Sequence, residues 1–124
     1  NDIAENTGPM TLEETAGNIF SMAQLAKAAN IKVIISSVLP ANTFPWRPEI
    51  KPAEKVIELN ILLKQYCEEN RITYLDYYSH MVDDKKGLDP RYGDDGVHPN
   101  LAGYKVMEGL VENAIKSALE KNGK

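Results

Sequence analysis

Apolar residues follow a helical spacing in three segments of the chain and form unbroken runs in two others. The first helical segment starts at Thr11-Leu12-Glu13-Glu14, a capping box in which the Thr11 hydroxyl accepts from the Glu14 amide. This pattern predicts a helix over residues 11–29, stopped by Asn30 in a left-handed conformation. Its apolar face comprises Leu12, Ala16, Ile19, Phe20, Ala23 and Ala26.

Two short runs rich in β-branched residues predict strands, at residues 31–39 and 72–77. Pro40 ends the first run, and the loop 40–52 that follows contains four prolines. Continuous apolar runs of this kind are typical of parallel strands that are covered on both faces.

The other two helical segments follow these strands. One begins near Pro52, which suits a first helical turn, and ends at Asn70. The other begins at Asn100, which can cap it, after an irregular acidic segment over residues 79–99. The predicted buried faces are Val56, Leu59, Leu62, Leu63 and Tyr66, and then Tyr104, Met107, Leu110, Val111, Ala114, Ile115 and Ala118.

The alternation of helices and strands predicts an α/β domain with parallel strands and right-handed crossovers. Two strands alone make a poor sheet, and both have the composition of strands with neighbours on each side. We therefore expect that a segment preceding Asn1, or another chain, completes the sheet.

Composition narrows the functional classes. Charged residues make up 26% of the 124 residues, and 18 acidic against 14 basic side chains give a net charge of −4. No basic stripe is present, which argues against a nucleic-acid partner. No apolar run approaches the ~20 residues of a membrane-spanning helix. The single Cys67 excludes an intramolecular disulfide, and no signal peptide is visible, so the sequence leaves the compartment open, whether secreted, periplasmic or other.

The most informative motif is Asp95-Gly96-Val97-His98-Pro99-Asn100. An acid three residues before a histidine can hold one imidazole nitrogen and leave the other free to take a proton from a nucleophile. The second histidine, His80, has no comparable neighbourhood and is expected to lie at the surface.

Asn1-Asp2 and Asp95-x-x-His98, joined by this order of helices and strands, resemble the C-terminal part of the SGNH (GDSL-type) hydrolases. The resemblance implies a three-layer α/β/α, flavodoxin-like fold with a central parallel sheet. Residues 1–124 would form the C-terminal portion of a single SGNH domain. It also implies a serine esterase or acyl hydrolase that needs no cofactor, with a small acylated carbohydrate or lipid as substrate.

By this resemblance His98 is the general base, Asp95 orients it, and the Asn1 amide donates to the oxyanion. The nucleophilic serine of a Ser-His-Asp triad would belong to a segment before residue 1, so the chain alone should be inactive. Ser36 and Ser37 lie at a strand end without the sharp glycine-flanked turn of a nucleophile, and Ser79 lies in an unmarked stretch.

Three alternatives stay open from the residues. Trp46 and Phe44 either form a wall for the acyl or leaving group or cover the sheet edge. The acidic loop could hold a hard cation, although its spacing matches no calcium loop and the prediction is no metal. The acidic residues of that loop are Asp83, Asp84, Asp89, Asp94 and Asp95. A non-enzymatic flavodoxin-like binding module is the alternative to the esterase.

Overall fold

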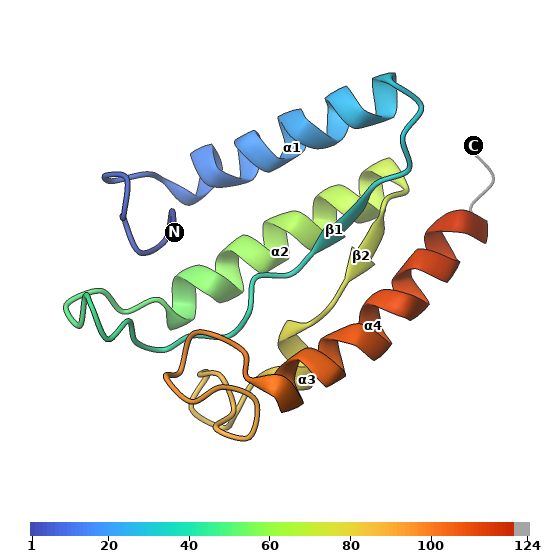
Figure 1. Cartoon of the computed structure of the whole chain (residues 1–124). Helices are drawn as coiled ribbons and strands as arrows, with labels where there is room; N and C mark the ends of the chain where they lie inside the picture. Colours follow the sequence, from blue (N-terminus) through green and yellow to red (C-terminus); the bar gives the residue numbers. More distant parts are fainter. Residues whose placement is uncertain (121–124) are drawn as a thin grey trace.

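The computed structural model describes residues 1–120 and contains four helices and a pair of parallel strands (Figure 1). The elements in chain order are α1 (Leu12–Ala28), β1 (Ile34–Ser36), α2 (Ala53–Asn70), β2 (Thr73–Leu75), α3 (Tyr78–Met81) and α4 (Leu101–Glu120). The predicted α/β class and the predicted order of the long elements are confirmed.

Helix ends follow local hydrogen bonding. The Thr11 hydroxyl accepts from the Glu14 amide at 3.0 Å, and the Glu14 carboxylate accepts from the Thr11 amide at 3.2 Å, so the predicted capping box is confirmed. Asn30 adopts the left-handed conformation with φ 61°. After α2 the left-handed residue is Arg71, with φ 56°, and not Asn70. Asn70 stays helical because its side chain donates to the Tyr66 carbonyl at 2.9 Å.

Both strands are shorter than predicted. In β1 only residues 34–36 are strand, although the Ser37 amide still donates to the Leu75 carbonyl of β2. One residue further on, the Asn60 side chain of α2 bonds both backbone groups of Val38: its Oδ1 accepts from the amide at 2.7 Å and its Nδ2 donates to the carbonyl at 3.2 Å. A side-chain amide therefore takes over from the neighbouring strand where β1 ends.

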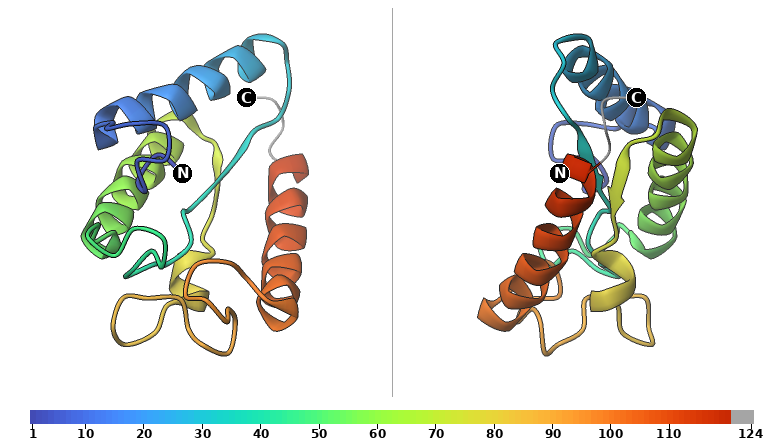
Figure 2. Two further views of the ribbon diagram at one scale, coloured as in Figure 1. Left: turned by 60° about the vertical axis from the view of Figure 1, so that its left-hand side comes forward. Right: turned by 90° about the vertical axis from the view of Figure 1, so that its right-hand side faces the viewer.

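The strands lie between helices. Helix α2 covers one face of the pair and α4 the other, and α1 packs against α2 on the side of β1 (Figure 2). The main core joins α1, α2 and the strands through the buried residues Ala16, Ala23, Ile35, Leu59, Leu63, Cys67 and Ile72. Within residues 1–120 no helix is both long and apolar enough to cross a bilayer.

The segment predicted to be irregular contains the short helix α3 and an antiparallel bridge between Val82 and Leu88. Neither was predicted, because four helical residues leave no periodic signal. The buried face predicted for α4 is only partly confirmed: Ala114 and Ala118 are buried, whereas Tyr104 and Ile115 are exposed. The reason is that the surface of two strands is narrower than the apolar stripe of α4 and leaves part of that stripe uncovered.

A groove of about 340 Å³ runs between α1 and β1. It is lined by Ile19, Met22, Ala23, Ala26, Val33, Ile34, Ile35 and Ser36. Within residues 1–120, β1 pairs only with β2, so its other edge faces this groove, and Met22 is largely exposed beside it.

We expect a further strand, from a preceding segment or from another chain, to pair with the open edge of β1, because unpaired backbone groups on an apolar edge favour strand addition. The isolated 124 residues should therefore associate or unfold without cooperativity. Light scattering measures the association, and denaturant melts measure the cooperativity. A monodisperse, cooperatively folding monomer would contradict this expectation.

One leucine and one isoleucine on α2 offer a test of the core. Leu63 is 1% exposed, whereas Ile61 on the same helix is 52% exposed. We expect Leu63→Ala to lower the free energy of unfolding by about 2–5 kcal/mol, because it removes packed methyl groups and leaves a cavity. Ile61→Ala should cost less than about 1 kcal/mol. Urea denaturation of the two variants, made in a protein extended by the preceding segment so that unfolding is cooperative, measures the difference, and equal losses would contradict the packing described.

Candidate functional site

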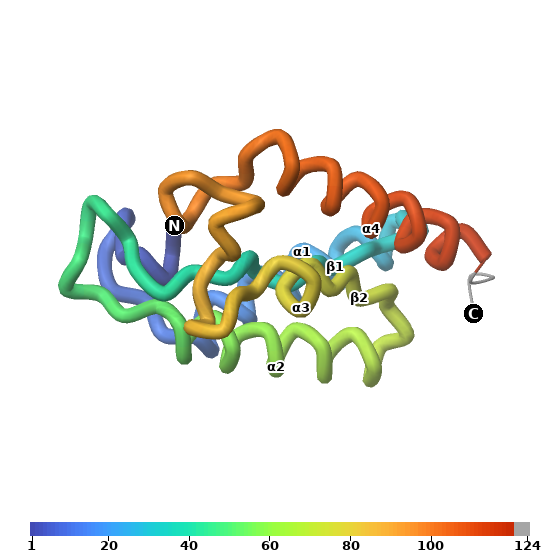
Figure 3. The backbone as a smooth tube through the Cα atoms, turned by 90° about the horizontal axis from the view of Figure 1, so that it is seen from below, coloured from blue at the N-terminus to red at the C-terminus, as the bar shows by residue number. Residues whose placement is uncertain are grey.

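Three loops meet at the end of the molecule toward which both strands run (Figure 3). They are the N-terminal turn, residues 1–8, the proline-rich loop after β1, and the loop that precedes α4. In open parallel sheets ligands bind at the carboxyl ends of the strands. The predicted site residues Asn1, Trp46, Asp95 and His98 all belong to these loops.

Asp95 and His98 form a closed turn. The Asp95 Oδ1 atom accepts from the backbone amides of Val97 and His98, at 2.8 and 2.7 Å. The other carboxylate oxygen, Oδ2, lies 2.7 Å from His98 Nδ1. When Nδ1 carries the proton and donates it to Asp95, Nε2 is left with its lone pair free. The predicted pairing of acid and base is present in the structure.

These contacts stabilise the ionised carboxylate. The His98 backbone amide, then the His98 imidazole and the Val97 amide, hold the pKa of Asp95 well below its usual range. The side chains of His98 and Asp95 are 70% and 45% exposed, so the attraction between these two side chains contributes little to folding stability, apart from the backbone hydrogen bonds to Asp95. Its effect is to fix the direction of the imidazole.

Two glycines allow this turn. Gly96 has φ 80°, a left-handed conformation that a side chain disfavours. At Gly93 a Cβ atom would lie 2.7 Å from the His98 carbonyl oxygen, so only glycine lets the two backbones approach. The exit is fixed by Asn100, whose Oδ1 accepts from the Gly103 amide at 3.0 Å, as the predicted cap requires, and whose Nδ2 donates to Asp94 at 3.2 Å.

The two aromatic residues of the proline-rich loop differ in environment. Phe44 is 7% exposed and lies in a second apolar cluster with Ala4, Ala41 and Ile50, against which Val97 packs. Trp46 is 47% exposed and stacks on Phe44, with ring centroids 5.2 Å apart. Its ring lies 6.1 Å from that of His98. Phe44 therefore joins the three loops, and Trp46 presents a ring beside the imidazole.

Asn1 reaches this group through a residue that the sequence did not single out. The Asn1 Oδ1 atom accepts from Asn6 Nδ2 at 2.9 Å, and the Asn6 Oδ1 atom accepts from Trp46 Nε1 at 3.2 Å. The backbone closes the same turn, since the Asn6 amide donates to the Asn1 carbonyl at 3.1 Å. An amide residue in a loop gives no sequence signal, so only the structure identifies Asn6.

The serines near the strand ends have structural partners. Ser37 is buried and its hydroxyl accepts from the Tyr78 amide at 2.9 Å, as expected for a hydroxyl bonded at the sheet edge. Ser79 donates to the Asp76 carboxylate at 2.7 Å and lies 3.3 Å from His80 Nδ1. Here the acid holds the serine and not the histidine, and Asp76 also accepts from the Ser79 amide. This arrangement caps α3 and is unlike a catalytic triad.

Residues 1–106 match the family of GDSL-like lipases and acylhydrolases. The chain belongs to this family. No curated protein matches it significantly.

Solved structures agree with the family. A candidate acylhydrolase from Bacteroides fragilis is 52% identical, with a TM-score of 0.93 over 97% of this chain and 59% of its own. A GDSL-like lipase from Bacteroides thetaiotaomicron is also 52% identical, with a TM-score of 0.92 over 95% of this chain and 58% of its own. The esterase domain of a zebrafish retrotransposon protein shares the fold at 19% identity and a TM-score of 0.69, over 90% of this chain and 63% of its own.

This GDSL-family chain therefore spans 59% and 58% of the length of the two Bacteroides structures. The comparison confirms the predicted SGNH fold, of which residues 1–120 supply two strands and their helices.

The acidic loop of this GDSL-family chain uses its carboxylates internally. Asp83 accepts from the amides of Lys85 and Gly87, both at 2.8 Å, and Asp89 pairs with Arg91, which lowers the pKa of that carboxyl. Among residues 1–120, no three His, Cys, Asp or Glu side chains group in a way that would hold a metal ion.

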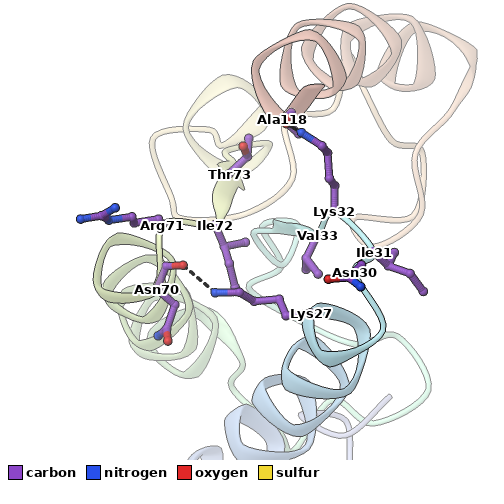
Figure 4. A pocket seen from close by; sticks show the side chains of 10 residues that line it. All are labelled: Lys27, Asn30, Ile31, Lys32, Val33, Asn70, Arg71, Ile72, Thr73 and Ala118. Carbon is purple, nitrogen blue, oxygen red and sulfur yellow. Dashed lines mark hydrogen bonds between the residues drawn. The ribbon is translucent and has the colours of Figure 1, made fainter. Parts of the chain in front are cut away.

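A separate cavity of about 280 Å³ lies at the opposite end of the strands (Figure 4). Two lysines beside it donate to carbonyls at helix ends: Lys27 to Asn70 at 2.9 Å, and Lys32 to Ala118 at 3.3 Å and Leu119 at 3.4 Å. Their charges stabilise the carboxyl ends of α2 and α4. None of the predicted site residues lines this cavity.

The lowered pKa of Asp95 predicts a dependence on pH. Because the folded-state pKa lies below the unfolded value of about 3.9, the contribution of Asp95 to stability is complete above that value. It falls progressively as pH decreases toward the folded-state pKa. The loss of stability in Asp95→Asn should thus be smaller at about pH 3 than at about pH 7.

Denaturant melts at the two pH values, in the protein extended by the preceding segment, measure this difference, and a carbon-detected NMR titration of the Asp95 carboxyl measures its pKa directly. Asp84→Asn is the matched control, since Asp84 is exposed and makes none of these hydrogen bonds. A carboxyl that titrates in the ordinary range of aspartate would contradict the prediction.

Proposed function

We propose that the intact protein is a serine ester hydrolase and that this chain supplies its base, its orienting acid and an oxyanion donor. The observation that carries the proposal is the bond of 2.7 Å between Asp95 Oδ2 and His98 Nδ1, which leaves Nε2 available in an imidazole whose ring lies 6.1 Å from that of Trp46. The nucleophilic serine comes from a segment that precedes residue 1. The length of the two similar structures, which extend well beyond the part matched here, supports this.

The reaction starts with the serine hydroxyl, whose oxygen attacks the ester carbonyl while His98 Nε2 takes its proton. Asp95 holds the Nδ1–H and stabilises the imidazolium that forms. The carbonyl oxygen becomes an oxyanion that accepts from the Asn1 side-chain amide. His98 then returns the proton to the departing alcohol, which leaves an acyl-enzyme.

The second half repeats these steps with water. His98 takes a proton from the water molecule, the hydroxyl adds to the acyl carbonyl, and the serine leaves with the proton that His98 returns. The net reaction converts an ester and water into a carboxylic acid and an alcohol. No step requires a metal or a cofactor.

The surroundings of His98 support a class of substrate. The exposed ring of Trp46 forms a flat wall for the acyl or leaving group, whereas Phe44 is buried and supports it from below. With most of the His98 side chain exposed in residues 1–120, a bulky alcohol can reach the base. Short acyl or acetyl esters of a carbohydrate or a lipid fit this arrangement.

The two histidines provide the test. In the protein that includes the serine, His98→Ala should lower kcat/KM for p-nitrophenyl acetate by about 10³-fold or more, because it removes the base that takes the serine proton. His80→Ala is the matched control: His80 is exposed, and its Nδ1 lies near the Asp76 carbonyl at 3.0 Å. It should leave activity within about twofold of the parent. Full activity in His98→Ala would refute the assignment of His98 as the base, whereas a parent protein without esterase activity would favour the binding module.

A further inference from the structure

We infer that Asn6 is a positioning residue that fixes which end of the Asn1 side chain faces the reacting carbonyl. The inference rests on the proposed function, in which Asn1 donates to the oxyanion. It starts from the chain of contacts that runs from Trp46 through Asn6 to Asn1.

The direction of this chain is set at the indole. Trp46 Nε1–H is only a donor, so the Asn6 atom that faces it at 3.2 Å must be the oxygen. The Asn6 nitrogen is then the atom that faces Asn1, and it is only a donor as well. The Asn1 atom at 2.9 Å must therefore be Oδ1.

The consequence concerns the remaining end of Asn1. An asparagine amide has one acceptor end and one donor end, and the acceptor end is already occupied. The Nδ2–H₂ group is left for another partner. An oxyanion needs a donor, and an amide turned the other way would present its carbonyl oxygen and repel the negative charge.

Packing holds the relay in place. Ala4 lies within the N-terminal turn, is buried, and joins Phe44 in the second apolar cluster. Phe44 stacks on Trp46, which sets the position of the indole. The Trp46 ring, which borders His98 on the substrate side, thus also determines which way the Asn1 side-chain amide is turned.

Asn6→Asp tests the relay in the protein that includes the serine. The introduced carboxylate would accept from Trp46 but cannot donate to Asn1, so Asn1 would turn its nitrogen toward that carboxylate. We expect kcat for p-nitrophenyl acetate to fall by at least about tenfold. The upper limit is the ~10²–10³-fold loss of kcat that follows removal of one oxyanion donor. KM should stay within about twofold, since the ground-state ester does not depend on this donor.

Two variants separate the relay from other effects. Thr7→Asp adds the same charge to an exposed neighbour outside the relay and should leave kcat within about twofold. Trp46→Phe keeps a ring but removes the donor, so in that background Asn6→Asp should lower kcat by a smaller factor than in the parent. Thermal melts of all variants report whether the fold is retained.

An equal fall of kcat in Thr7→Asp, or an unchanged kcat in Asn6→Asp, would overturn the relay. A rise in KM at constant kcat would overturn it too, because it would assign Asn6 to substrate binding. His98→Ala in the same assay tests the hydrolase itself. If that variant is inactive while Asn6→Asp is fully active, the esterase proposal stands and only the relay fails.

Discussion

The arrangement of the site depends on one carboxylate that closes the turn in which it lies. Asp95 accepts from two backbone amides with one oxygen and faces the His98 imidazole with the other. The two bonds from backbone amides fix the position of the His98 backbone, and the contact with Nδ1 fixes the orientation of its imidazole ring. Because the turn is closed within four residues, it needs little support from the distant core. The glycines at 93 and 96 supply the unusual backbone geometry that it requires.

Much of the fold could be predicted from the sequence. Long helices have strong signals, and the capping box at Thr11 and the cap at Asn100 both form as expected. The predicted strand limits were wrong because the sequence contains more residues of strand-like composition than the neighbouring strand can pair with. Ile31 to Leu39 has the composition of a longer strand, yet pairing with β2 stops near Ser37 and Asn60 binds the backbone beyond it. A side chain from α2 in that position leaves no pattern in the sequence.

The candidate site also contains residues that the sequence could predict and residues that it could not. Asp95 and His98 are close in the chain, so their spacing was enough to predict their contact. The sequence left Trp46 and Phe44 together as either a substrate wall or a cover for the sheet edge, and the difference between their environments emerged only from packing. Asn6 was missed entirely, since its significance arises from contacts with residues 5 and 40 positions away in the chain. Hydrogen bonds between loops are set by tertiary packing, which periodicity does not describe.

The double use of Trp46 constrains how this protein can diverge. In the proposed reaction its ring borders the space of the acyl or alcohol group, which makes position 46 a natural place for selection to alter substrate range. The same indole N–H sets the orientation of two amides that lead to Asn1. A smaller apolar residue there would enlarge the space and release that orientation together. The proposed mechanism thus links substrate range and turnover at this position, and it predicts that new specificities arise more readily by changes around the tryptophan than by its replacement.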